Sequence, residues 1–293
     1  ADVFIQNLAP GATQRLGIGS DELRQRHHRL ITCDISGYGD SGKLTKMKAY
    51  DLLVQAESGL VSINGAPGDW GRIGVSICDI NAGLNALIGI QQALIRRGQT
   101  GQGSAVKVSL FDSAAELMSV PYLQARYGGK APERVGLKHP SIAPYEAFAT
   151  ADGGAITISI QNEREWAGFC EKVLDQPTLA ADERFNTGSN RSANREALQK
   201  KIDAVLGKMS KAVVLQKLDA VGIANAELRD MRSFGDHPQL EQRARWREVQ
   251  IPGNQTAKSL IPPVTAGSYT AAMKGVPALG EHTTAILAEF GLS

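Results

Sequence analysis

Cysteine is scarce in this sequence, with three among 293 residues: Cys33, Cys78 and Cys170. Their number is odd, their spacing is wide and no CxxC pair occurs, so the sequence indicates neither a disulfide framework nor a cysteine zinc site. Cysteines without a disulfide partner fit the reducing cytoplasm, which is the location we expect. Cys78 is a poor candidate nucleophile, because a thiol in apolar surroundings has a raised pKa and is usually inert.

A surplus of charge is also missing. The chain carries 32 Lys and Arg against 30 Asp and Glu, a formal charge of +2, and has no basic block or stripe, so we expect no nucleic-acid partner. No apolar run approaches the roughly 18 residues that a membrane helix needs, so we expect no membrane association.

Several catalytic signatures are absent. There is no GxSxG elbow, no Walker phosphate loop, no HExxH motif and no GxGxxG after a predicted strand. We expect no metal site, because the five histidines are scattered without metal spacing: His27, His28, His139, His237 and His282.

The most informative stretch is 71–97, GRIGVSICDINAGLNALIGIQQALIRR. Apolar residues recur at intervals of three and four after Asp79, which predicts a helix that begins near this residue. An aspartate at that place can cap the first turn. Alternatively, its apolar neighbours and the glycines around it indicate a poorly hydrated carboxylate with room for a ligand, which is a candidate nucleophile.

The order of elements predicts the fold class. Residues 2–8, 30–35 and 105–110 have strand patterns with helical stretches between them, which predicts an α/β protein with a parallel sheet. Ser113 and Glu116 suggest a capping box for the helix after the third strand. Glycine, proline and charge mark a boundary between 127 and 141. A second unit follows, with a strand at 155–160, a helix capped by Asn162 and Glu165, and an irregular stretch at 234–277.

Taken together, the motifs resemble the class III CoA-transferases, the family that includes formyl-CoA transferase, carnitine CoA-transferase and α-methylacyl-CoA racemase. The resemblance is carried, in chain order, by ADVFIQNLAPGATQRLG, LITCDISGYGDSG, KAYDLLVQAESGL, the Asp79 stretch, HPSIAPYEAF, QNEREW and LGEHTTAILAEFGL. It implies a Rossmann-like parallel sheet domain, a smaller α+β domain and an interlocked homodimer. Family members have an additional N-terminal stretch, so we expect the N-terminal part to be missing here.

The resemblance also implies a domain plan. Residues 1–126 correspond to the large CoA-binding domain and 127–235 to the small domain. Residues 236–275 correspond to a return linker, and 276–293 to a C-terminal helix that packs on the large domain.

The resemblance implies the chemistry and its residues. Asp79 falls on the family's catalytic aspartate, which takes CoA from an acyl-CoA thioester as an aspartyl-CoA intermediate and passes it to a small carboxylic acid. The loop 136–144 corresponds to a loop that closes the site in several transferases and could supply amides to oxyanions. Coenzyme A enters as substrate and no metal is implied. Positions that contact CoA in the family correspond to Asn7, Leu8, Arg15, Met47, Lys48, Ala49 and Tyr50.

Two other functions stay open at this point. The racemase has a catalytic histidine directly before the position of Asp51, but this chain has Tyr50 there, and a phenol is a poor base at neutral pH. The chain could also bind CoA without turnover. Asp51 itself either supports Asp79 or is a surface charge of its helix.

The motifs HPSIAPYEAF, QNEREW and GRIG look most like the branch that acts on small dicarboxylic acids such as succinate, mesaconate, itaconate or citramalate. The sequence does not identify the CoA donor, the acceptor or the residue that binds the distal carboxylate.

Overall fold

The computed structural model describes the whole chain except residues 265 and 293. It forms two compact units, Ala1–Ala226 and Glu227–Ser293, and we describe each by itself.

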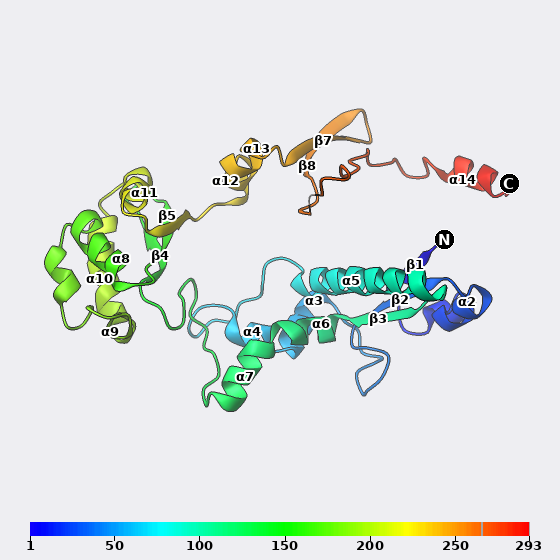
Figure 1. The fold of residues 1–293 in the computed structure, drawn as a ribbon, viewed down its shortest axis with the longest axis horizontal. Coiled ribbons are helices and arrows are strands. Elements are labelled where there is room, and N and C mark those ends of the chain that lie inside the picture. Colours follow the sequence, from blue (N-terminus) through cyan, green and yellow to red (C-terminus); the bar gives the residue numbers. More distant parts are fainter. Residues whose placement is uncertain (265, 293) are drawn as a thin grey trace. The chain divides into compact units, whose positions relative to one another are not determined.

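The first unit contains a three-stranded parallel sheet (Figure 1). Its strands are β1 (Val3–Gln6), β2 (Ile31–Ser36) and β3 (Ala105–Ser109), with β2 in the centre. Helices α1 (Ala12–Arg15) and α2 (Ser20–Arg26) connect β1 to β2. The parallel α/β arrangement expected from the order of elements is confirmed.

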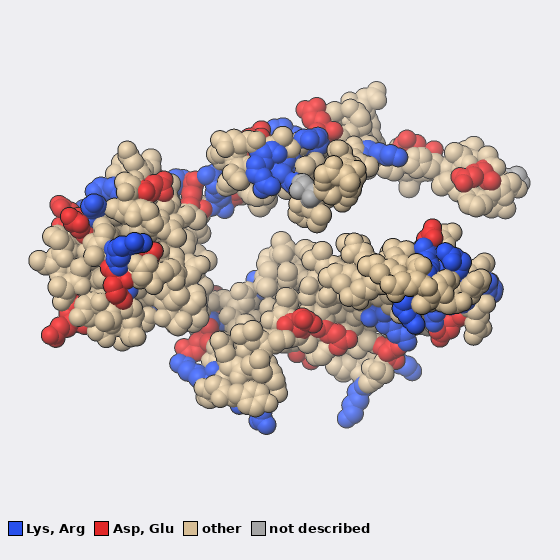
Figure 2. Space-filling model, in the orientation of Figure 1, with Lys and Arg blue, Asp and Glu red and all other residues tan. Residues whose placement is uncertain are grey.

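Helix α5 (Ile77–Thr100) is the long helix that packs on this sheet (Figure 1). It contacts the sheet through Ala86, Gly89 and Ile90, and at Gly89 the approach is so close that an added Cβ would lie 2.7 Å from Val106 Cγ1. Its buried residues are Cys78, Ala82, Ala86, Ile90 and Ala93. The larger apolar residues that indicated the helix lie on its exposed side: Ile80, Leu84, Leu87, Ile88, Leu94 and Ile95. In the view of Figure 2 the surface over most of α5 is formed by uncharged residues.

Four shorter helices complete this part of the unit. Helices α3 (Asp51–Glu57) and α4 (Leu60–Ile63) precede α5, and α6 (Leu110–Leu117) and α7 (Ser119–Tyr127) follow β3. The predicted capping box at Ser113 is wrong. Ser109 caps α6 instead, because its hydroxyl accepts a hydrogen bond from Asp112 N (2.9 Å), which places Ser113 inside the helix.

A second group of elements in the same unit is α+β. Strands β4 (Tyr145–Ala149) and β5 (Ala155–Ser159) are antiparallel, and β6 (Ala224–Glu227) extends their sheet. The helices are α8 (Glu163–Gly168), α9 (Gly188–Ala193), α10 (Arg195–Leu206) and α11 (Lys211–Ala220), with a π-helical turn at Phe169–Val173 and a 3-10 turn at Pro177–Ala181. The cap predicted at Asn162 is confirmed, since its side chain accepts from Glu165 N.

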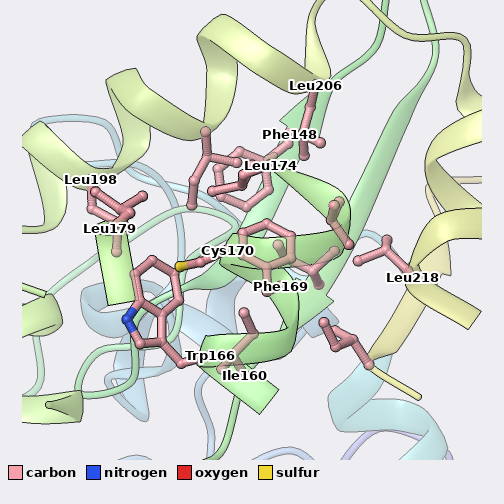
Figure 3. Close-up of a cluster of buried hydrophobic side chains, with 14 of the residues drawn as sticks. Phe148, Ile160, Trp166, Phe169, Cys170, Leu174, Leu179, Leu198, Leu206 and Leu218 are labelled. Carbon is pink, nitrogen blue, oxygen red and sulfur yellow. The ribbon is translucent and has the colours of Figure 1, made fainter. Parts of the chain in front are cut away.

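An apolar core joins these elements (Figure 3). Figure 3 shows the Trp166 and Phe169 rings together with Phe148 of β4 and with leucine side chains of the surrounding helices, such as Leu198 and Leu218. Their burial stabilises this part of the chain without any contribution from a disulfide, because the three cysteines are free and buried.

The second unit consists of short elements. Helices α12 (Met231–Gly235) and α13 (Pro238–Gln242) precede a hairpin of β7 (Trp246–Ile251) and β8 (Gln255–Leu260), and α14 (Thr283–Glu289) lies near the end. The expectation that 234–277 is irregular is therefore wrong for the hairpin. Within residues 1–264 and 266–292, no helix is long and apolar enough to cross a membrane.

Candidate active site

The candidate site lies at the edge of the parallel sheet where the strands have their carboxyl ends. Open α/β sheets bind ligands at this edge. Helix α5 runs into β3, so its first turn lies at the carboxyl edge while its last turn lies at the other. A hydrogen bond from Asn81 Nδ2 to Ser113 O (2.7 Å) confirms this, because α6 begins directly after β3.

Asp79 lies in the first turn of α5, as the sequence predicted. Its side chain makes no hydrogen bond with any described residue, so it does not act as a cap. Asp79 is exposed as a residue, but neighbouring atoms remove part of the water around its carboxylate. This partial desolvation and the negative charge of Asp51 both raise the pKa of Asp79. Asp79 therefore has the accessibility of a nucleophile and a proton affinity above that of an ordinary aspartate.

Two glycines near Asp79 in the sequence border open space. A Cβ added at Gly83, one turn after Asp79, would meet no atom within 4 Å, and the same holds at Gly74 in the preceding loop. Gly71 has a different role, since it packs against Gly65. A Cβ added at Gly71 would lie 2.9 Å from the Gly65 Cα. Gly83, which lies on the same face of α5 as Asp79, thus leaves room for a ligand beside this carboxylate.

Asp51 is buried at the start of α3 and supports the first turn of α5. Its Oδ1 accepts from Cys78 N (2.8 Å) and its Oδ2 accepts from Gln55 Nε2 (2.6 Å). Gln55 in turn accepts from Ile73 N (2.9 Å) and donates to Ile73 O (3.3 Å). Asp51 and Gln55 therefore fix the chain that leads to Asp79 at two points, and the surface-charge interpretation of Asp51 is wrong.

The segment 47–50 lies beside this support because Tyr50 directly precedes Asp51. Tyr50, Met47 and Lys48 are exposed. Ala49 is half-buried and packs on Gly37, where any side chain would overlap the Ala49 Cβ. The bond from Cys78 N to Asp51 thus links the end of this segment to the first turn of α5.

The predicted residues after β1 share the sheet edge with Asp79. Leu8 N donates to Gln6 Oε1 (2.8 Å), and the Gln6 amide donates to Asp34 (2.7 Å), which fixes the chain as it leaves β1. Asn7 and Arg15 are exposed, and Arg15 makes no ion pair with a described residue. No hydrogen bond or ion pair between described residues joins Asn7, Leu8 or Arg15 to the first turn of α5.

The loop 136–144 is held tightly. His139 Nδ1 accepts from Ser141 N and Ile142 N (both 3.2 Å), so these two amides are not free to bind an oxyanion. Arg195 donates to His139 O and Ile142 O (both 2.7 Å), and Arg191 Nε donates to Ala143 O (3.0 Å). This α9–α10 contribution was not predicted.

Two further features bear on the chemistry. Burial and the nearby Asp51 raise the pKa of the Cys78 thiol to about 12, so the thiol stays protonated and unreactive. Within the part of the chain that the structure describes, no group of three or more His, Cys, Asp or Glu could hold a metal ion.

Known proteins resemble this chain along nearly its whole length. Residues 1–283 match the model of CoA-transferase family III. The chain is 33% identical to acetyl-CoA:oxalate CoA-transferase of Acetobacter aceti, over 99% of the chain and 74% of the relative. It is 31% identical to human succinyl-CoA:glutarate CoA-transferase, over 98% of the chain and 66% of the relative. A crystal structure of a CAIB/BAIF family protein from Brucella suis superimposes with a TM-score of 0.89 at 30% identity, covering 99% of this chain and 75% of that one. The chain thus spans about two thirds to three quarters of the length of these proteins.

Proposed function

This chain belongs to CoA-transferase family III, a family of enzymes, and on that premise we propose that it transfers CoA from an acyl-CoA thioester to a small carboxylic acid. The observation that carries the proposal is the support of the first turn of α5 by Asp51, which leaves Asp79 accessible at the carboxyl edge of the sheet. The named acids of the relatives, oxalate and glutarate, favour a dicarboxylic acceptor.

We propose that Asp79 forms the covalent intermediate. Its carboxylate attacks the acyl carbon, the carbon–sulfur bond breaks, and CoA leaves as the thiolate. A mixed anhydride between Asp79 and the acyl group remains. The thiolate then attacks Cγ of Asp79, which releases the first acid as a carboxylate and leaves an aspartyl-CoA thioester. The acceptor carboxylate attacks this thioester and expels the thiolate, which gives a second mixed anhydride between Asp79 and the acceptor. The thiolate finally attacks the acceptor's carbonyl carbon in this anhydride, which forms the new CoA thioester and frees Asp79. No net proton is consumed.

The energetics suit this sequence of steps. One thioester is exchanged for another, so the overall reaction is near balance and needs no nucleotide. The raised pKa of Asp79 shows that its surroundings stabilise the negative charge less than water does. A carboxylate that is less stabilised is a stronger nucleophile. The oxyanions formed on the way need hydrogen-bond donors. Ile77 N, Cys78 N and Ile80 N already donate to Val75 O, Asp51 and Ser76 O. The backbone N–H of Asp79, which has no partner among the described residues, is therefore the candidate donor in the first turn of α5.

We assign CoA binding to the residues around this edge. Arg15 and Lys48 are exposed cations suited to the phosphates of CoA. Tyr50 and Met47 have exposed apolar surface that the remaining parts of CoA can contact. With these, Asn7, Leu8 and Ala49 complete the proposed set.

We further propose a homodimer in the cytoplasm. The exposed Leu and Ile side chains of α5 favour burial against another protein surface. Three free buried cysteines fit a reducing compartment.

The test is CoA exchange between a labelled acid and its own CoA thioester. We expect exchange by the wild-type protein and its loss in Asp79→Asn. The matched control is Asp112→Asn, because Asp112 is also an exposed aspartate in the first turn of a helix, and this variant should retain exchange. Exchange that survives in Asp79→Asn would contradict the proposal. Solvent exchange of the α-proton of a 2-methylacyl-CoA without CoA transfer would favour the racemase instead.

A further inference from the structure

We propose that Arg72 binds the distal carboxylate of a dicarboxylate substrate, the carboxylate that does not react with CoA. The inference rests on the proposed function, because it assumes that Asp79 handles the reacting end. Arg72 was not assigned any role by the sequence.

The backbone around Arg72 is fixed relative to Asp79. Ile73, the next residue, is held through both its N–H and its carbonyl by the Gln55 amide (2.9 and 3.3 Å). Gln55 is bonded to Asp51, which also holds Cys78 N. Arg72 and Asp79 therefore stand at the two ends of a short segment that one pair of buried side chains anchors.

The Arg72 side chain extends toward the start of α5. Its Nη2 donates to Gly74 O (3.2 Å), two residues closer to Asp79 along the chain. A guanidinium has five N–H donors, and this contact occupies one of them. The remaining donors can form the paired hydrogen bonds that a carboxylate accepts from arginine.

The charge of Arg72 has no internal partner. Among the described residues no carboxylate lies within ion-pair distance of its guanidinium, and the side chain is exposed. Asp79 is not its counter-ion either, since burial and Asp51 raise the pKa of Asp79, whereas a close arginine would lower it. An unpaired guanidinium beside a proposed carboxylate-processing site is suited to an anionic substrate.

A glycine near each of the two groups borders open space. Gly74 separates Arg72 from α5, and an added Cβ at Gly74 would meet no atom within 4 Å. Gly83, beside Asp79 on α5, borders open space as well. The surface next to each group is thus uncovered, as binding of the two ends of a small dicarboxylate requires.

The chemistry predicts which kinetic constant depends on Arg72. The distal carboxylate keeps its charge of −1 through every step, so its interaction with Arg72 is the same in the ground state and the transition state. Such uniform binding lowers KM and leaves kcat unchanged.

The experiment compares succinate with butyrate, which has the same number of carbons but lacks the distal carboxylate. Exchange of each labelled acid with its own CoA thioester is measured for wild type, Arg72→Gln, Arg72→Lys and the control Arg164→Gln, an exposed arginine of α8. In Arg72→Gln we expect KM for succinate to rise about ten- to a hundredfold with kcat retained, because a charged hydrogen-bonded contact is lost. We expect KM for butyrate to change less than about twofold, since it makes no contact that the substitution removes. Arg72→Lys should lie between wild type and Arg72→Gln, and the control should match wild type.

Two results would overturn the inference. Equal effects of Arg72→Gln on succinate and butyrate would show a general role, and an unchanged KM for succinate would show none. Both leave the proposed function intact, because wild-type exchange is still observed. Absence of wild-type exchange with every acid and thioester would instead refute the proposed function, and the inference with it.

Discussion

Replacement of Asp51 by asparagine tests the support of Asp79 in two ways. The aspartate accepts hydrogen bonds from Cys78 N and Gln55 Nε2. Asparagine can keep the first bond, but its amide then faces the Gln55 amide, donor against donor. Gln55 cannot rotate to compensate without losing both bonds to Ile73. At least one buried hydrogen bond is lost in either case, and we expect a loss of about 1–3 kcal/mol in the free energy of unfolding.

The same substitution should change the pH dependence. Asp51 is one of the two causes that raise the pKa of Asp79, so removal of its charge should lower that pKa toward the ordinary value of 3.8. Catalysis needs the carboxylate form, so the acid limb of the kcat/KM profile should move to lower pH in Asp51→Asn. The folded state of the wild type binds the extra proton between pH 3.8 and the raised pKa, so stability due to Asp79 falls as pH rises through that window. The variant should show a smaller fall.

Exchange kinetics across pH and thermal unfolding measure these two effects. Glu146→Gln is the matched control, because Glu146 is also a buried carboxylate but lies in β4, away from Asp79. It should lower stability and leave the acid limb in place. An acid limb that does not move in Asp51→Asn, or that moves to higher pH, would refute the electrostatic coupling between Asp51 and Asp79.

Two other predictions follow from the site. Gly83→Leu should keep the free energy of unfolding or raise it by about 0.5–1 kcal/mol, since Gly83 is inside a helix and faces open space. CoA exchange should fall, because the leucine fills the room beside Asp79. Unchanged exchange in a folded variant would contradict this. Cys78 should resist alkylation by iodoacetamide at pH 8 in the folded protein and react after denaturation, because it is buried with a pKa of about 12. Peptide mass spectrometry locates the modification, and rapid alkylation of Cys78 in the native protein would contradict this prediction.

Much of the fold could be predicted from the sequence because local patterns matched the tertiary structure. The three strands of the parallel sheet and helix α5 are dictated by apolar runs and periodicity. The contact face of α5 was not predictable in this way. Large apolar residues dominate the pattern, but Ala86, Gly89 and Ile90 meet the sheet, and the small size of Ala86 and Gly89 allows the close approach.

The missed elements also have physical reasons. Hairpin β7–β8 is largely polar, and apolar alternation in β7 is limited to Val249 and Ile251, which is too short to predict a strand. Its turn has Gly253 and Asn254 at positive φ. In α6 two serines, Ser109 and Ser113, each precede an acidic residue by three positions, and the sequence does not show which one is the cap.

The candidate site was predicted only in part. Asp79 was identifiable from its place at the start of an apolar helix, and this placement is observed. The supporting pair was not, because a polar residue four positions after Asp51 usually indicates a solvated helix face, whereas Gln55 is buried. Its role depends on Ile73, which is distant in sequence and close only in the folded chain.

The most direct test of the account is chemical trapping of the intermediate. The protein is incubated with an acyl-CoA substrate, treated with hydroxylamine and digested, and the peptide that contains Asp79 is analysed by mass spectrometry. An aspartyl-CoA thioester would be converted to a hydroxamate, so we predict a hydroxamate at Asp79 that depends on acyl-CoA. Unmodified Asp79 in protein that is exchanging CoA under the same conditions would contradict the account.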